Sequence, residues 1–307
     1  MGGRGVEGRY VVGAIDFPPV HREWLPACFA GMGPPPPMIH PLDLATTLDN
    51  PGADVRIGRT SEDYWAFVGP FGGASAAILM RAVMDHPQRL GDPLALTVNY
   101  CAPLAKGVYE VHAKPARTNR STQHWTLELR QGGETILTGT AVTAVRRDSF
   151  SHAPVVPPQV PPPGDVAAYR MREGGPAWVN RYEFRFAEGA PRFGAPDGGE
   201  PHSALSHLWM RDAPPRPLDH VALAGLSDAF IARIFHVQGQ MTPFGTVSLT
   251  TYFLGTADEL ARQSDRYLLG VADAKRFHRN YFDQSIELWS ADGALLATGV
   301  QVAYFKL

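Results

Sequence analysis

The sequence predicts an α+β fold made of two tandem copies of one unit, each an antiparallel sheet packed against a central apolar helix. The first observation is an internal repeat: Thr126-Leu127-Glu128-Leu129 then Thr138-Gly139 parallels Ser285-Ile286-Glu287-Leu288 then Thr298-Gly299. The second is that the order of elements is the same on both sides of a proline-rich stretch. Hairpins gathered around one apolar helix are typical of antiparallel α+β domains.

In the first half, a pair of strands is expected at about Val55–Val68. The segment Gly69-Pro70-Phe71-Gly72-Gly73 ends it, because glycine and proline favour turns, and the apolar run Ala74–Met84 predicts a helix. Four strands are then expected, at Leu94–Tyr100, Val108–Arg117, Gln123–Gln131 and Thr135–Arg146.

The second half repeats this order. Opening strands are expected at Asn180–Phe186 and Ala204–Arg211, followed by a helix over about Asp219–Phe235 that is apolar nearly all round and therefore buried. The last four strands are expected at Thr246–Leu254, Tyr267–Phe277, Asp283–Ser290 and Leu295–Phe305.

Two proline runs divide the chain. Pro34–Pro37 favours polyproline II, which can neither continue a helix nor enter a central strand, so a domain is expected to begin after it. Met38 follows directly as a candidate natural start, and a genuine flexible arm is the alternative. The second run, Pro154–Pro163, is typical of a semi-rigid linker. The expected parts are an N-terminal extension (residues 1–40), an N-terminal unit (41–150), a linker (151–176) and a C-terminal unit (177–307).

Composition excludes several classes of function. The 307 residues are 44% hydrophobic and 19% charged, as in ordinary globular proteins. The formal net charge of -2 argues against a nucleic-acid partner, because there is no basic excess to neutralise phosphates. No apolar run reaches the ~18 residues of a membrane-spanning helix. Two cysteines are too few for a disulfide framework, which predicts a reducing, cytoplasmic setting. The histidine spacing shows no zinc motif, so no metal is expected.

Two polar residues stand on surfaces that are otherwise apolar. Asp228 falls within the predicted second helix, where a buried carboxylate needs hydrogen-bond partners or a raised pKa, and either makes it a candidate general base. Gln301 shares a strand face with small apolar residues, and a buried amide also needs partners. The first half has Ala141 in place of Gln301 and no carboxylate before Asp85. A structural carboxylate and a core amide that ties two strands remain the alternatives.

These residues resemble the acyl-CoA thioesterase II family, the double-hotdog thioesterases, from about Pro41 to Leu307. Phe71-Gly72-Gly73 is similar to the opening of that family's first hotdog helix, and Leu226-Ser227-Asp228-Ala229-Phe230 is similar to its second. The resemblance implies that Asp228, Thr246 and Gln301 are catalytic and hold a water against a thioester carbonyl. Thr246 is singled out by the resemblance alone, because its strand alternates like a solvated face. The family often has Asp and His two and three residues after this Thr, where this chain has Ser248 and Leu249.

The implied activity is hydrolysis of an acyl-CoA thioester, within fatty acid metabolism, without a cofactor. Backbone N–H groups near Gly72 and Gly73, or near Ser227 and Asp228, are candidates for the oxyanion, because a helix start has unpaired donors. Candidates for the coenzyme A phosphates are Arg120, Arg276 and Arg279. A homodimer or higher homo-oligomer is also implied. The alternatives are a hydratase or dehydratase acting on an acyl thioester, and an acyl-binding hotdog protein of a lipid or polyketide pathway.

Overall fold

The computed structural model describes residues 39–49, 54–171, 174–192 and 201–307, which fall in one compact unit, Ile39–Leu307. The candidate start at Met38 and almost all of the expected extension of residues 1–40 lie outside the described residues.

The described residues of the N-terminal half form six strands, one long helix and two short helical segments. The helix α2 coincides with the predicted apolar run and extends two residues further towards the N-terminus. The elements are α1 (Pro41–Ala45), β1 (Leu48–Asp49), β2 (Val55–Arg59), η1 (Glu62–Tyr64), α2 (Gly72–Met84), β3 (Asp92–Tyr100), β4 (Val108–Thr118), β5 (Thr122–Gln131) and β6 (Glu134–Ala144).

The C-terminal half repeats this plan after a long connection. Its elements are η2 (Pro163–Asp165), η3 (Ala177–Arg181), β7 (Tyr182–Glu188), β8 (Ser206–Asp212), α3 (His220–Leu226), α4 (Arg233–Gln238), β9 (Phe244–Phe253), α5 (Ala257–Gln263), β10 (Leu268–Asp273), β11 (Phe277–His278), β12 (Tyr281–Trp289) and β13 (Leu295–Phe305). The predicted tandem architecture is confirmed.

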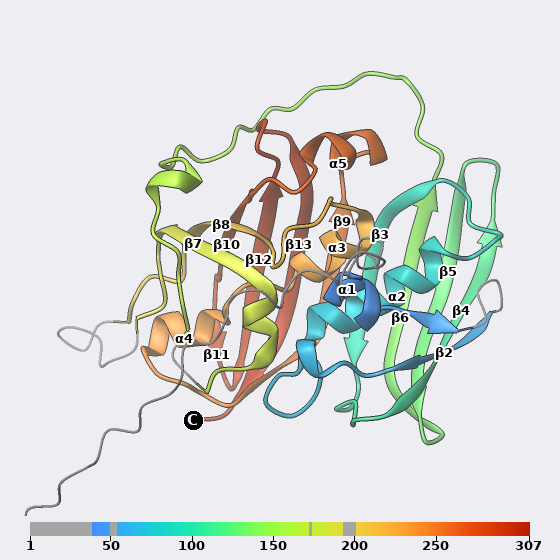
Figure 1. Cartoon of the computed structure of the whole chain (residues 1–307), viewed down its shortest axis with the longest axis horizontal. Coiled ribbons are helices and arrows are strands. Elements are labelled where there is room, and N and C mark those ends of the chain that lie inside the picture. The colour runs from blue at the N-terminus through green and yellow to red at the C-terminus, as the bar shows by residue number, and fades with distance from the viewer. Residues whose placement is uncertain (1–38, 50–53, 172–173, 193–200) are drawn as a thin grey trace, which may run out of the picture. The chain divides into compact units, whose positions relative to one another are not determined.

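The two half-sheets join edge to edge in a single antiparallel sheet (Figure 1). Among the described strands the order is β1-β2-β4-β5-β6-β3-β9-β13-β12-β10-β8-β7. From the junction outwards, β3-β6-β5-β4-β2 on one side matches β9-β13-β12-β10-β8 on the other. The repeat in the sequence is therefore a repeat in space, with the two copies meeting at β3 and β9.

The junction is held by backbone pairing and by side chains. The antiparallel register of β3 and β9 pairs Leu96 with Thr251 and Val98 with Leu249. On the same ladder the hydroxyls of Thr97 and Thr250 lie 3.0 Å apart. Beyond the ladder, Arg146, which follows β6, donates to the carbonyl oxygen of Leu254, which follows β9, at 3.0 Å. The two halves are thus continuous through the sheet.

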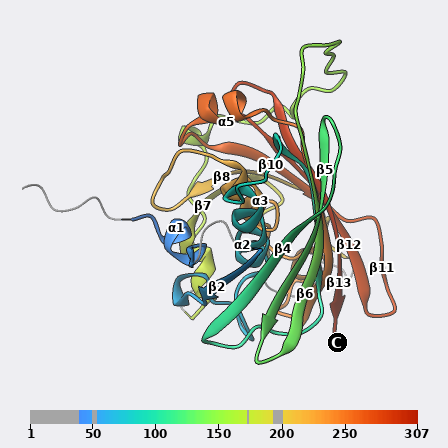
Figure 2. The same cartoon turned by 90° about the vertical axis from the view of Figure 1, so that its right-hand side faces the viewer.

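The helices α2 and α3 lie together on one face of the sheet (Figure 2). They approach so closely that a Cβ built on Gly73 would lie 2.4 Å from the carbonyl oxygen of Gly225. Phe71, the residue before α2, stacks on Trp178 with ring centroids 4.2 Å apart. Glycine at the contact lets backbone touch backbone, which places the start of α2 against the end of α3.

Two predicted strand segments are wrong in part. Only Val55–Arg59 of the first pair is a strand, because the Ser61 side chain accepts a hydrogen bond from the Asp63 N–H and starts a short 3-10 turn. The predicted strand Tyr267–Phe277 is interrupted after Asp273, where the carboxylate of Asp283 accepts hydrogen bonds from the N–H groups of Lys275 and Arg276.

The predicted single helix Asp219–Phe235 is also wrong. It is divided into α3 and α4, and Asp228 lies in the turn that follows α3. The Ser227 hydroxyl donates to the Ala224 carbonyl oxygen at 2.8 Å and accepts from Thr251 Oγ1 at 2.8 Å. Ser and Asp side chains compete with the helix for backbone partners, and here this competition ends the helix.

The proline-rich connection between the halves passes over one edge of the molecule from β6 to η2 (Figure 1). It is anchored on the C-terminal half. Trp209 Nε1 donates to the Pro161 carbonyl oxygen at 2.8 Å, and the Arg185 guanidinium donates to the Val166 carbonyl oxygen at 2.8 Å.

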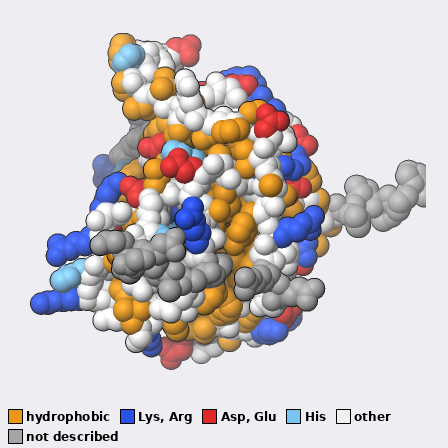
Figure 3. Space-filling view, turned by 90° about the vertical axis from the view of Figure 1, so that its left-hand side faces the viewer, with side chains coloured by type: hydrophobic (Ala, Val, Ile, Leu, Met, Phe, Trp, Pro, Cys, Tyr) orange, Lys and Arg blue, Asp and Glu red, His pale blue; other side chains and the backbone are white. Residues whose placement is uncertain are grey.

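The domain limits expected from the sequence stay a prediction. No helix in the described part of the chain is long and apolar enough to cross a membrane. Acidic and basic side chains are interspersed on the face near β7 and α4 (Figure 3).

We expect Gly73→Ala to destabilise the protein by about 1–3 kcal/mol, because the added methyl group must push α2 away from the Gly225 carbonyl oxygen. Thermal unfolding followed by circular dichroism measures this. Gly164→Ala is the matched control, since a Cβ there meets nothing within 4 Å. Equal melting temperatures for the two variants would contradict a tight helix contact.

Candidate active site

A cavity of about 360 Å3 has walls from both halves. The N-terminal half contributes the loop before α2, the first turn of α2 and the residues that end β3. The C-terminal half contributes the turn after α3 and the ends of β9, β12 and β13 that lie beside it. The exposed side chains of Phe67, Val68 and Met241 also belong to its lining.

Asp228 lines this cavity with only 7% of its surface exposed. Burial raises the pKa of its carboxyl group from 3.8 to about 7, against the opposing effect of hydrogen bonds from the Gly73 N–H and the Gln301 side chain. At neutral pH this carboxylate is therefore ionised, and able to accept a proton, in a substantial fraction of the protein molecules.

Gln301 connects the other two predicted residues. Its Oε1 accepts a hydrogen bond from Thr246 Oγ1 at 3.0 Å, which leaves its Nε2 to donate to Asp228. The structure thus brings Asp228, Gln301 and Thr246 together in one hydrogen-bonded chain. The hydroxyl proton of Thr246 is committed to Gln301, so the hydroxyl oxygen is available as an acceptor.

A β-bulge turns Thr246 towards the cavity. Along β9 the register with β13 pairs Ser248 with Val302 but Thr246 with Ala303, so Val247 is an extra residue. Strict alternation would place Thr246 on the outer face with Ser248 and Thr250. The extra residue reverses the alternation and puts Thr246 on the inner face, beside Gln301.

The first turn of α2 forms another wall. A Cβ built on Gly72 would lie 2.6 Å from Asp228 Oδ2, so a larger residue there would displace the carboxylate. The Gly73 N–H donates to the Asp228 carboxylate, and the N–H groups of Ser227 and Asp228 donate to helix carbonyl oxygens. Of the N–H groups expected to meet an oxyanion, that of Gly72 lies on the cavity wall and donates to no backbone carbonyl oxygen of the described residues.

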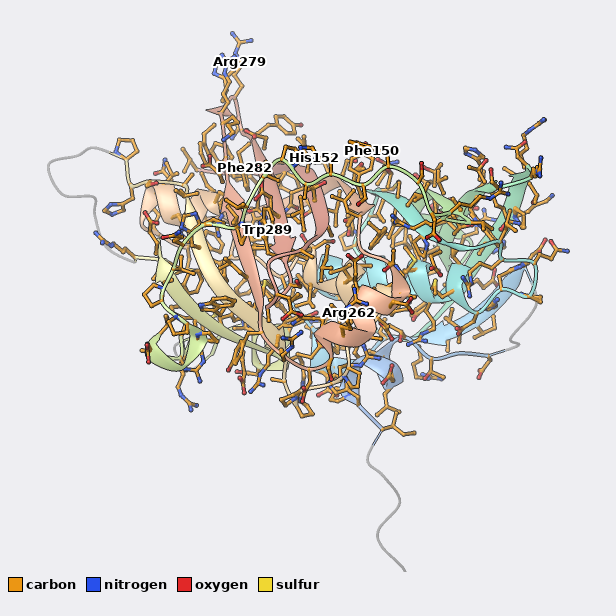
Figure 4. The ribbon with its side chains drawn as sticks, turned by 90° about the horizontal axis from the view of Figure 1, so that it is seen from above. Phe150, His152, Arg262, Arg279, Phe282 and Trp289 are labelled. Carbon is orange, nitrogen blue, oxygen red and sulfur yellow. The ribbon has the colours of Figure 1, made fainter. Side chains whose placement is uncertain are left out.

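The three arginines predicted to meet coenzyme A do not come together. Arg120 lies in the β4–β5 turn, at the end of the sheet where β6 finishes, as the bond from the Val145 N–H to the neighbouring Ser121 carbonyl oxygen shows. Arg276 and Arg279 lie beside the β11–β12 hairpin at the other end. Arg279 projects away from the body of the molecule, whereas Phe282, on the following strand, lines the cavity (Figure 4). A role for any of them in binding stays a prediction.

Two protein-family models match the chain. The model of the acyl-CoA thioesterase N-terminal domain matches residues 61–144, and that of the acyl-CoA thioesterase C-terminal domain matches residues 155–305. The chain belongs to the acyl-CoA thioesterase family. No curated protein matches it at a significant level.

Two solved structures illustrate the similarity of this family member to known folds. A conserved protein of unknown function with a hot dog fold from Alicyclobacillus acidocaldarius is 45% identical, with a TM-score of 0.82 over 88% of this chain and 99% of that one. An acyl-CoA thioesterase II from Mycobacterium marinum is 18% identical, with a TM-score of 0.68 over 86% and 98%. The second comparison shows the fold alone.

Two lining residues of this family member were missed in the sequence. Tyr100 Oη donates to the Gly72 carbonyl oxygen at 2.8 Å and so fixes the start of α2. Gln284 is fully buried on the inner face of β12 and lines the cavity. Its signal was present, since it alternates with Ile286 and Leu288 in the same way as Gln301 alternates with its apolar neighbours. The described residues contain no cluster of His, Cys, Asp and Glu that could hold a metal ion.

We expect Asp228→Asn to stabilise the fold, and by more at high pH. The folded state raises this pKa, so the wild type loses stability as pH rises from about 4 through 7, while the neutral Asn does not titrate. The stability difference between variant and wild type should grow by roughly 2 kcal/mol between about pH 5.5 and pH 8.5, measured by chemical denaturation.

Asp212 does not disturb this comparison. Burial also raises its pKa to about 7, but it is present in both proteins and its contribution cancels. A stability difference that is the same at both pH values would show that Asp228 does not titrate as described.

Proposed function

We propose that this protein hydrolyses acyl-CoA thioesters to a free acid and coenzyme A, with Asp228 as the general base and Thr246 and Gln301 as the residues that orient water. The observation that carries the proposal is the hydrogen-bonded chain from Thr246 through Gln301 to Asp228 on the wall of one cavity. Membership of the acyl-CoA thioesterase family supports it.

The available donors and acceptors fit a single water molecule. Such a water donates one hydrogen to the Asp228 carboxylate and the other to Thr246 Oγ1, whose own proton is already bound to Gln301. Its oxygen lone pair then points away from both acceptors, towards a thioester carbonyl carbon. Fixing a nucleophile in this way removes much of the entropic barrier of a bimolecular attack.

The reaction then needs one proton acceptor and one site for negative charge. The water oxygen bonds to the carbonyl carbon as its proton passes to Asp228, and the carbonyl oxygen becomes an oxyanion. The Gly72 N–H at the positive end of the α2 dipole is our proposed donor to it. When the carbon–sulfur bond breaks, the thiolate of coenzyme A receives the proton from Asp228, which restores the carboxylate.

The remaining inferences extend this proposal. The apolar lining of the cavity fits an acyl chain, and Arg276 and Arg279 lie at the same end of the sheet as the cavity. We propose them as contacts for the coenzyme A phosphates. The homo-oligomer and the cytoplasmic location stay predictions, and the chemistry requires no cofactor.

We expect Asp228→Asn to lower kcat for thiol release from acyl-CoA by about 10²- to 10⁴-fold, because the variant cannot accept the proton of the attacking water. Free thiol is measured with a chromogenic reagent over a panel of acyl-CoAs. Asp212→Asn is the matched control: it removes a carboxyl of similar burial and pKa that does not line the cavity, and it should keep activity. Equal losses in the two variants would mean that Asp228 is only structural.

The pH dependence follows from the raised pKa of Asp228. Only the ionised carboxylate accepts a proton, so kcat/KM should rise with pH, reach half its maximum near pH 7 and level off above it. In Asp228→Asn the residual rate should lack this limb. A wild-type profile already flat at pH 5 would contradict the assignment of the base.

A further inference from the structure

Four glutamines are buried among the described residues, and three of them use both ends of the amide. Gln123 accepts from the Leu90 N–H and donates to the Gln88 carbonyl oxygen, Gln263 accepts from the Ala291 N–H and donates to the Arg266 carbonyl oxygen, and Gln301 joins Thr246 to Asp228. Gln284, at 0% exposure, has no hydrogen-bond partner for either Nε2 or Oε1. A buried unpaired amide lowers stability, which calls for a physical explanation.

The position of Gln284 supplies one. It is the register partner of Gln301 on β13, so their side chains lie next to each other on the inner face of the sheet. Both residues line the cavity. Its unpaired amide therefore lies beside Gln301 in the wall of the cavity, and because its exposed fraction is 0%, its side chain must turn towards the cavity to contact a bound molecule.

Its surroundings do not offer a free protein partner. The amide of Gln301 beside it is already bonded to Thr246 and Asp228, and the other neighbours along the inner faces of β12 and β13 include Phe282, Ile286 and Ala303, all buried and apolar. Phe230 and Ile231, which follow Asp228, also line the cavity. An apolar side chain would suit this wall at least as well, so the amide fits a polar atom of a bound molecule.

We propose that Gln284 binds a hydroxyl group on the acyl chain, and that the substrates of this protein are hydroxyacyl thioesters. This inference rests on the function proposed above. A hydroxyl both donates and accepts, which matches an amide with a free Oε1 acceptor and free Nε2 donors. No Lys or Arg is found among the described lining residues, so a charged carboxylate substituent lacks a counter-charge there.

Such a contact discriminates strongly. A site built to bond a substrate hydroxyl rejects the analogue that lacks it, because binding the analogue leaves the buried amide unpaired. Replacing the amide by an apolar group of similar size removes that penalty, and the preference should then disappear.

The test compares butanoyl-CoA with 2-, 3- and 4-hydroxybutanoyl-CoA in the wild type and in Gln284→Leu. We expect the wild type to favour at least one hydroxylated substrate in kcat/KM by about 10-fold or more, and Gln284→Leu to lower that ratio by about 10- to 100-fold. Gln123→Leu is the matched control, a buried amide that does not line the cavity, and it should keep the wild-type ratio. A wild type without a preference, or a ratio unchanged in Gln284→Leu, overturns the inference.

Stability gives a second, independent measurement. Gln284→Leu should raise the melting temperature of the free protein, because it removes an unpaired buried amide, whereas Gln123→Leu should lower it by breaking bonds that exist. A clear loss of stability in Gln284→Leu would show that Gln284 has a structural partner and would overturn the inference.

Failure of the proposed function is distinguishable from failure of this inference. If no acyl-CoA in a wider panel releases thiol, hydrolysis is wrong. Calorimetric titration of Asp228→Asn with the same four thioesters then tests Gln284 alone, since tighter binding of a hydroxylated thioester supports its role and equal affinities reject it.

Discussion

Gly73 and Gly225 lie where α2 meets α3, and the lack of a side chain at Gly73 lets the backbones of the two helices touch. The contact brings the first turn of α2, in the N-terminal half, against the last turn of α3, in the C-terminal half. From it follow the placement of the Gly73 N–H on the Asp228 carboxylate and the burial of that carboxylate beneath the start of α2. The same helix contact therefore determines the shape of the cavity, the raised pKa of Asp228 and the position of the positive end of the α2 dipole at the cavity wall.

Much of this arrangement is readable from the sequence. The internal repeat predicts two similar units, and the sheet order confirms it, because β3-β6-β5-β4-β2 mirrors β9-β13-β12-β10-β8 about the junction. Asp228 and Gln301 are detectable as polar residues in apolar patterns, and both are buried on one cavity wall. Local pattern is sufficient for these features because burying a polar group costs free energy in any fold, so a polar residue within an apolar stretch indicates a special role.

Other features depend on contacts that a local pattern does not contain. The end of α3 is set by Ser227, whose hydroxyl bonds to Thr251 on a strand that is distant in sequence. The inward orientation of Thr246 depends on a bulge in the pairing of β9 with β13, which reverses the alternation that the sequence suggests. The two half-sheets join at β3 and β9. The residue types of these two strands do not mark them as the pair that joins the halves.

The continuity of the sheet has a consequence for the dynamics of the site. Since β3 and β9 share a hydrogen-bonded ladder and α2 and α3 are in backbone contact, the two halves cannot swing apart without breaking both. Opening of the cavity by a hinge between halves is therefore unfavourable. Access for a ligand depends on smaller motions at the rim, where Phe67, Val68 and Met241 are exposed apolar side chains free to change rotamer on the picosecond-to-nanosecond timescale of surface residues.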